Sequence, residues 1–151
     1  MRLDWAILSN FAEIAPNGLH YALGSGWDTG NRPEFPASFG GALSIRVLFD
    51  RLEVGRQHSV EIHFSDEDGK PVVPPLIATA SGGTVPPGWP IGWDIPLMFV
   101  INLQSIAIPR PGIYAIDILI DGQNLRKLPL RFLQEATMPP GIMPPRPPGA
   151  A

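Results

Sequence analysis

The stretch RPGIYAIDILIDGQNLRKLPLRF, residues 110–132, decides the fold class because it joins two alternating segments by a tight turn. Every second residue of 114–120 is apolar, and the same spacing returns in 128–132. Alternation with a period of two is typical of half-buried antiparallel strands. Asp121–Gly122 lies between the segments, and such a pair favours a hairpin because glycine accepts a positive φ without steric penalty. This stretch therefore predicts the last hairpin of a β-domain.

The same alternation recurs along the chain, and no window of helical length keeps an apolar stripe free of proline and glycine. About eight short strands separated by turn signals predict an all-β domain, an antiparallel two-sheet β-sandwich that is immunoglobulin-like or related. The expected domain covers 1–135, and a proline-rich tail covers 136–151. The expected strands lie within 3–8, 19–23, 42–50, 58–65, 72–80, 97–103, 114–120 and 128–132.

Tyr114 adds a topological prediction. It lies two residues before Ile116, which would occupy a core position of the penultimate strand. In immunoglobulin-like sandwiches a tyrosine at such a corner hydrogen-bonds to backbone a few residues upstream. We therefore expect the Tyr114 hydroxyl to do the same.

Composition excludes several classes of function. Hydrophobic residues make up 44% of the 151 residues and charged residues 17%, as in a globular protein. The net charge is −3 without a cluster of Lys or Arg, so we expect no nucleic-acid partner. Cysteine is absent, which excludes disulfides and thiolate chemistry and favours the cytoplasm. The N-terminal stretch lacks the long apolar region of a signal peptide, and the apolar run 95–108 is too short to span a bilayer, so we expect no membrane partner.

The acidic run SDEDGK, residues 65–70, allows two interpretations. Asp68–Gly69 has the sequence of a hairpin turn. An EF-hand loop would need acids where Phe64 and Pro75 stand, so that calcium motif fails. Asp66 and Asp68 remain candidates for a looser calcium site that also takes ligands from another loop. We favour the hairpin.

Three of the four tryptophans lie among glycines and prolines, in GSGWDTG and VPPGWPIGWDIP. Trp27, Trp89 and Trp93 could anchor a protein partner or stack on sugar rings, with Asp28 and Asp94 accepting hydrogen bonds from hydroxyl groups. They could also close the ends of the sandwich and bury their indoles, as large aromatic side chains commonly do.

No catalytic constellation is visible in the sequence. Glu61 and His63 share the polar face of one expected strand, but no HExxH pattern supplies a third metal ligand. The chain has no G-x-S-x-G nucleophile elbow, and its glycine-rich segments lack the lysine of a P-loop. We therefore expect no cofactor and no enzymatic activity.

The proline-rich tail favours an extended polyproline II conformation. Pro144, Pro145, Arg146, Pro147 and Pro148 could dock into an aromatic-lined groove of a partner or of a second copy, or simply end the domain. Exposed strand edges also leave a homo-oligomer open.

Four stretches together resemble an uncharacterised bacterial family: NFAEI, GLHYALGSGWDT, HSVEIHFSDEDGKPV and PRPGIYAIDILIDGQNLRKLPLRF. The resemblance implies a small cytoplasmic β-sandwich protein, and it carries over no catalytic or binding residue. The leading hypothesis is a non-enzymatic module for protein–protein interaction or structure whose partner is unknown. The alternatives are a carbohydrate-binding domain that uses the loop tryptophans and a sandwich domain that binds calcium in a loop.

Overall fold

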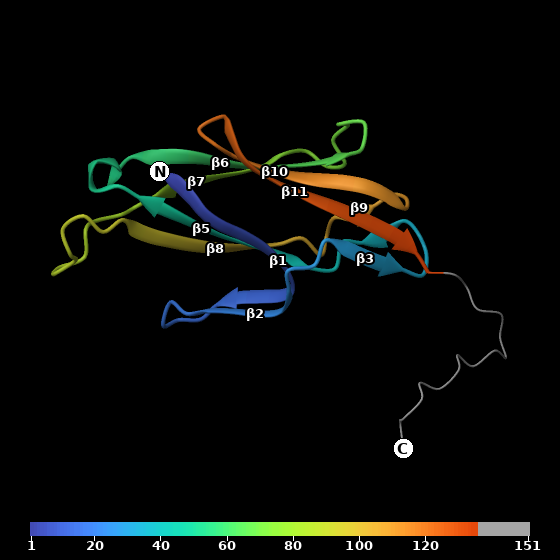
Figure 1. The fold of residues 1–151 in the computed structure, drawn as a ribbon, viewed down its shortest axis with the longest axis horizontal. Helices are drawn as coiled ribbons and strands as arrows, with labels where there is room; N and C mark the ends of the chain where they lie inside the picture. The colour runs from blue at the N-terminus through green and yellow to red at the C-terminus, as the bar shows by residue number, and fades with distance from the viewer. Residues whose placement is uncertain (136–151) are drawn as a thin grey trace, which may run out of the picture.

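The computed structural model describes residues 1–135, and in it the chain is all-β with two larger sheets that pack against each other (Figure 1). One turn of 3-10 helix, η1 (Arg51–Glu53), accompanies the strands. The strands of the described residues are β1 (Arg2–Ile14), β2 (His20–Ser25), β3 (Thr29–Arg32), β4 (Ala37–Ser38), β5 (Ala42–Phe49), β6 (Gln57–Asp66), β7 (Leu76–Ser81), β8 (Ile95–Asn102), β9 (Ala107–Ile108), β10 (Gly112–Ile120) and β11 (Gln123–Gln134).

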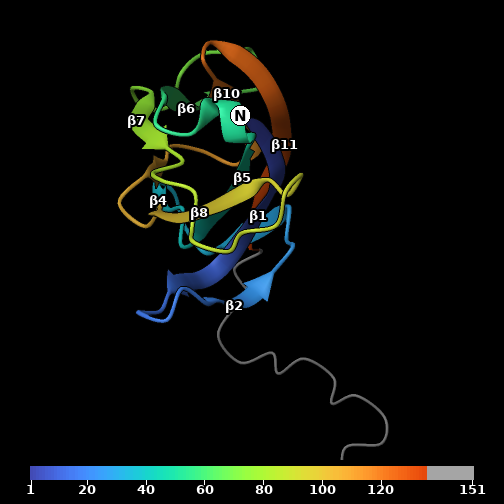
Figure 2. The same ribbon diagram turned by 90° about the vertical axis from the view of Figure 1, so that its left-hand side faces the viewer.

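The sheets have a defined strand order. One sheet runs β2-β1-β5-β8, the other runs β3-β11-β10-β6-β7, and β4 and β9 form a small third sheet. Figure 2 shows the two layers, with β1 beside β11 at one flank. All strand pairs are antiparallel except β3 with β11, which is parallel. The expectation of a purely antiparallel sandwich is therefore wrong at this one pair.

The alternation seen in the sequence becomes the core between the two sheets. On β5 the residues Leu43, Ile45, Val47 and Phe49 are fully buried. Burial of each such side chain contributes roughly 1.5–3 kcal/mol, so a sheet with one apolar face is stable only when another sheet covers it. The buried residues that face β5 from the other sheet include Val60, Ile62, Phe64, Ile116, Ile118, Leu130 and Phe132.

Tyr114 makes the predicted corner contact. Its hydroxyl donates a hydrogen bond of 2.7 Å to the carbonyl oxygen of Arg110. The ring is 2% exposed and packs between Phe64 and Phe132, whose centroids lie 5.5 and 5.9 Å away. The prediction from residues 110–132 is confirmed at this residue.

Both predicted hairpin turns are present. The Gly69 amide donates to the Asp66 carbonyl over 3.0 Å, and Gly69 has a φ of 76°. At the other turn Asp121 and Gly122 have φ values of 51° and 76°. The acidic run therefore forms the turn between β6 and β7, as predicted.

The number of strands differs from the expectation of about eight, because eleven strands are present in the described residues. The strands missed are β3, β4 and β9, which span only two to four residues and carry no alternation that sequence reading could detect. In addition, β7 begins at Leu76 rather than Val72, because Pro74 and Pro75 have no amide hydrogen to donate to β6.

Candidate functional site

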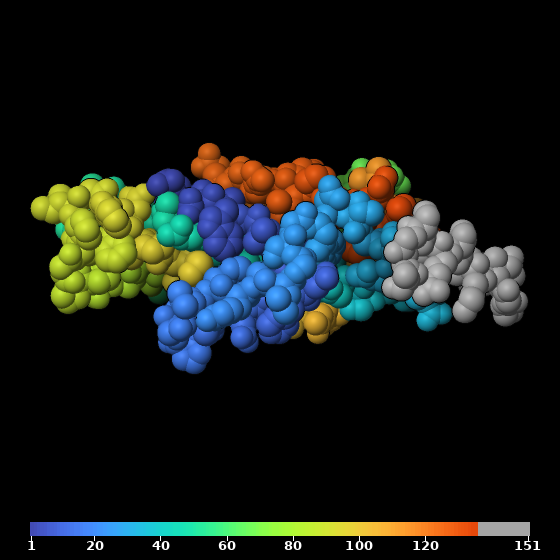
Figure 3. Space-filling view, turned by 60° about the horizontal axis from the view of Figure 1, so that its bottom comes forward, coloured from blue at the N-terminus to red at the C-terminus, as the bar shows by residue number. Residues whose placement is uncertain are grey.

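Three large apolar side chains are exposed in η1 and in the loop between β7 and β8, two segments that hydrogen bonds join at one end of the molecule. Ile91 is 92% exposed and Trp93 is 63% exposed, both in the loop between β7 and β8. Leu52, in η1, is 86% exposed. Figure 3 shows the β7–β8 loop as a lobe (yellow-green) at this end. We call Leu52, Ile91 and Trp93 the apolar end.

A repeated turn motif shapes the loop. The sequence Pro-x-Gly-Trp occurs twice in succession, at 86–89 and 90–93. In each copy the tryptophan amide donates to the proline carbonyl, over 3.1 and 3.3 Å. The third residues, Gly88 and Gly92, have φ values of 76° and 83°, which that turn position requires and which glycine adopts without strain. Ile91 occupies the second position of the second turn, where its side chain points to solvent.

Polar contacts join this loop to the rest of the domain. The Arg51 guanidinium donates to the carbonyl oxygens of Trp89 and Pro90 over 2.6 and 3.3 Å, which ties η1 to the loop. The Asp94 carboxylate accepts hydrogen bonds of 2.8 and 3.1 Å from Arg2. Asp94 is therefore engaged in an ion pair that closes the base of the loop.

Trp89 and Trp93 have different surroundings. Trp89 is partly buried against the core, and its Nε1 has no acceptor among the described residues. The Trp93 ring stands nearly perpendicular to it, at 86° and a centroid distance of 6.2 Å. The Trp89 ring thus packs edge-to-face against the Trp93 ring, and of the two only Trp93 is largely exposed for contact with a partner.

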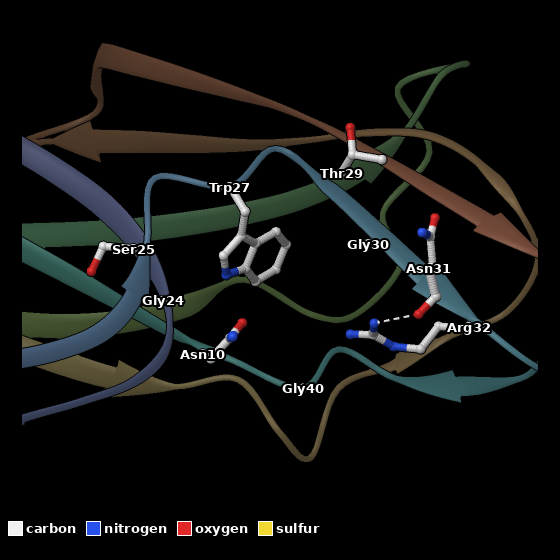
Figure 4. A pocket seen from close by; sticks show the side chains of 9 residues that line it. All are labelled: Asn10, Gly24, Ser25, Trp27, Thr29, Gly30, Asn31, Arg32 and Gly40. Carbon is white, nitrogen blue, oxygen red and sulfur yellow. Dashed lines mark hydrogen bonds between the residues drawn. The ribbon is translucent and has the colours of Figure 1, made fainter. Parts of the chain in front are cut away.

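Trp27 lies elsewhere, between β2 and β3, and is not brought together with the other two tryptophans. Its ring packs against Phe39 and Phe132 at centroid distances of 5.5 and 6.5 Å. It lines an open groove of about 450 Å³ (Figure 4). Asp28 is not among the residues that line the groove, and its carboxylate accepts a hydrogen bond of 2.9 Å from the hydroxyl of Thr29, which does line it. The lining residues are Asn10, Gly24, Ser25, Trp27, Thr29, Gly30, Asn31, Arg32 and Gly40.

The calcium candidates lie in the β6–β7 turn. The Asp66 carboxylate accepts hydrogen bonds from the amides of Asp68 and Lys70, over 3.1 and 3.0 Å. Asp68 is exposed at the tip. Within residues 1–135 no group of three or more His, Asp or Glu is arranged to hold a metal ion. The carboxylate of Asp66 thus stabilises the turn, and calcium binding here stays a prediction.

His58 and His63 each contact a different carboxylate. His63 and Glu61 contact each other over 3.0 Å on the outer face of β6. His58 is buried, and its Nδ1 lies 2.7 Å from the Asp121 carboxylate. The hydrogen bond with His58 lowers the pKa of Asp121 below its ordinary value. Because Asp121 also binds the Ser59 amide over 3.0 Å, this pair fastens the β10–β11 turn to β6.

Sequence reading missed most residues of both surfaces. Leu52 and Ile91 carried no signal as single residues, although the repeated Pro-x-Gly-Trp motif marks the turn that exposes Ile91. Asn10 lies on β1 whereas Asn31 and Arg32 lie on β3, and these two strands belong to different sheets that meet only in the folded chain. The tail residues 144–148 lie outside the described residues. No helix within the described part is long and apolar enough to cross a membrane.

Comparison with known proteins places the chain in a family. No curated protein and no solved structure matches the chain. The model of a family of unknown function, DUF6941, matches residues 4–133, which include both surfaces described above. This match confirms the resemblance to an uncharacterised family: the chain belongs to DUF6941, a family of unknown function.

Proposed function

We propose that this domain is a non-enzymatic interaction module that binds a protein partner through the apolar end. The observation that carries the proposal is the exposure of Leu52, Ile91 and Trp93: Ile91 and Leu52 are the two most exposed large apolar residues of the described chain, and Trp93 is its most exposed tryptophan. Large apolar and aromatic side chains gathered on a surface mark interaction sites, and tryptophan is enriched among the residues that dominate binding energy.

The rigidity of the loop supports this proposal. Two hydrogen-bonded turns, the Arg51 contact and the Trp89 ring hold Trp93 in place before any partner arrives. A preorganised contact loses less conformational entropy on binding, so more of the contact free energy appears as affinity.

The immunoglobulin-like interpretation of the scaffold belongs to the same proposal. The Tyr114 corner and the hairpin that follows it support this interpretation. Domains of this architecture commonly present their loops at the two ends of the sandwich for contact. The absence of cysteine supports a cytoplasmic setting.

The surroundings of the polar residues support a non-enzymatic role. The Ser44 hydroxyl lies 2.8 Å from His20 Nε2, a pairing that nucleophilic enzymes use. Ser44 is only 1% exposed, however, beneath the β1–β2 hairpin. A substrate could not reach that hydroxyl, so the pair supports the packing of the hairpin.

Crosslinking tests the proposal directly. A photoreactive amino acid at position 91 should capture a protein partner in cells, whereas the same residue at position 77 should not. Ile77 is the matched control because it is also exposed, at 70%, but lies on β7 away from the apolar end. Equal capture at both positions, or capture at neither, would contradict the proposal.

Affinity for the captured partner then measures the anchor. Trp93→Ala should weaken binding by about 2 kcal/mol or more, because it removes a preorganised aromatic contact. Ile77→Ala should leave the affinity unchanged. The sugar-binding alternative predicts instead that oligosaccharides change the tryptophan fluorescence of the wild type and that Trp93→Ala reduces this response.

A further inference from the structure

We propose that the groove beside Trp27 binds a small anionic, oxygen-rich ligand: a carboxylate, phosphate or sulfate group carried on a sugar-sized body. The groove shares no residue with the apolar end, so the two proposals stand or fall separately. Its side chains come from β1, the end of β2, the following loop and β3 (Figure 4).

Trp27 contributes an unused hydrogen-bond donor. Its Nε1 is buried and has no acceptor among the described residues. Figure 4 shows this nitrogen on the side of the ring that faces Asn10. An indole N–H can only donate, and this nitrogen is enclosed, so a ligand oxygen would reach it only with a shift of the Trp27 ring.

Arg32 supplies a fixed positive charge. Its guanidinium donates to the carbonyl oxygens of Ser38 over 3.0 Å, Asn31 over 2.8 Å and Phe39, and it lies 5.4 Å from the Phe132 ring centroid. These bonds engage three of the five N–H groups of a guanidinium, which leaves two for a ligand. Within the described residues Arg32 forms no ion pair with a carboxylate.

The remaining lining is also suited to an anion. None of the nine lining residues is acidic. The side-chain amides of Asn10 and Asn31 are exposed and make no hydrogen bond within the described residues, so both can donate to a ligand. The charge and the donors therefore point to oxygen atoms that carry negative charge.

Glycines keep the groove open. A Cβ at Gly40 would lie 2.9 Å from Arg32 Nη2, and one at Gly24 would lie 2.5 Å from Asn10 Nδ2. At Gly30 a Cβ would lie 2.8 Å from Phe132. Larger residues at Gly40 and Gly24 would displace Arg32 and Asn10, which line the groove, whereas a larger residue at Gly30 would displace the core residue Phe132. The volume of about 450 Å³ is that of a small-molecule site rather than of an ion site alone.

The test follows the indole N–H resonances of the full chain by NMR. Trp27→Phe keeps the aromatic packing but removes Nε1, so the resonance missing from its spectrum belongs to Trp27. Glucuronate and inorganic phosphate should each shift the Trp27 resonance in a saturable way, and neutral glucose should not. The tighter of the two anions identifies the carboxylate or the phosphate as the preferred group.

A charge-matched pair of variants locates the binding. Asn31→Asp places a negative charge in the groove and should weaken anion binding on the order of tenfold. Asn17→Asp makes the same charge change in the β1–β2 turn, where its side-chain oxygen still accepts the Leu19 amide, and should leave binding unchanged. The proposal is overturned if neither anion shifts the Trp27 resonance, if glucose shifts it equally, or if both variants bind as tightly as the wild type.

Discussion

At the scale of single residues, Tyr114 links the sequence to the architecture. Its ring fills the core between Phe64 and Phe132, and its hydroxyl binds the Arg110 carbonyl. Burial raises the pKa of the Tyr114 hydroxyl, so the folded state favours the protonated, neutral side chain. The contribution of Tyr114 to the free energy of unfolding is therefore complete below the pKa of the unfolded state, and it is lost as the pH rises through the higher pKa of the folded state.

Replacing Tyr114 by Phe should lower the free energy of unfolding by about 1–2 kcal/mol, because the Arg110 carbonyl then lacks its buried partner. Urea denaturation measures the change. The chain has two tyrosines, and Tyr21 is 50% exposed, so Tyr21→Phe is the matched control and should change stability by less than about 0.5 kcal/mol. Equal effects of both variants would contradict the corner role.

Asp121 gives the pH-dependent prediction. Its pKa is lowered, chiefly by the hydrogen bond with His58. The ionised carboxylate therefore adds to the free energy of unfolding above the pKa of the unfolded state, and this contribution is lost as the pH falls through the lower pKa of the folded state. Asp121→Asn, which tolerates the positive φ, should lower the free energy of unfolding by about 1 kcal/mol near neutral pH, a small value because the carboxylate is half exposed.

The same difference should shrink at acidic pH. Urea midpoints of wild type and Asp121→Asn, compared at about pH 7 and at several values below about pH 4, measure it, because the stabilisation declines once the pH falls below the unfolded pKa of the carboxyl group. Asp68→Asn, an exposed turn residue outside every ion pair of the described residues, controls for loss of charge. If the difference in urea midpoint between wild type and Asp121→Asn stays constant with pH, the contact with His58 does not depend on the charge of the Asp121 carboxylate.

At the scale of elements, the turns determine how the strands pair. Gly69 has a φ of 76°, and a Cβ there would meet nothing within 4 Å. Gly69→Ala should therefore lower the free energy of unfolding by about 1 kcal/mol through backbone strain alone. Gly69→Asn should cost less because asparagine tolerates left-handed backbone. Thermal melting of the two variants measures the difference, and an Ala variant as stable as wild type would refute it.

Strands were predictable from sequence where one face is buried along several residues. β6 alternates between buried and half-buried residues because it packs one face on the core, whereas β5 alternates in sequence although nearly all of its residues are buried. β3 has the sequence TGNR, which has no apolar pattern, and its pairing depends on β11 being in place beside it. Its parallel direction follows from the path of the chain, which local sequence does not encode.

At the scale of the whole molecule, the C-terminal strand closes the domain. Residues 131–134 pair with β3, and the Glu135 amide donates to the Arg32 carbonyl over 2.8 Å. Phe132 is fully buried between Trp27, Phe39 and Tyr114. The core therefore depends on the chain as far as Glu135.

Two truncations test this boundary by thermal melting followed with circular dichroism. A chain that ends at Glu135 should melt within about 2 °C of the full chain, because it keeps the core and the β3 pairing. A chain that ends at Leu130 loses Phe132 and should be destabilised by at least about 3–5 kcal/mol. Similar melting of the two truncated chains would place the boundary elsewhere.

The sequence by itself determined the all-β class, the main apolar faces, the two Asp-Gly turns and the corner at Tyr114, because each depends on neighbouring residues and on backbone preferences. Only the tertiary structure decided which tryptophan is exposed and which residues meet. Leu52 and Trp93 lie in two segments far apart in the sequence, η1 and the β7–β8 loop, which Arg51 ties together. Asn10 and Arg32 share a groove although β1 and β3 belong to different sheets, because the packing of the two sheets brings these strands together, and local periodicity does not specify that packing.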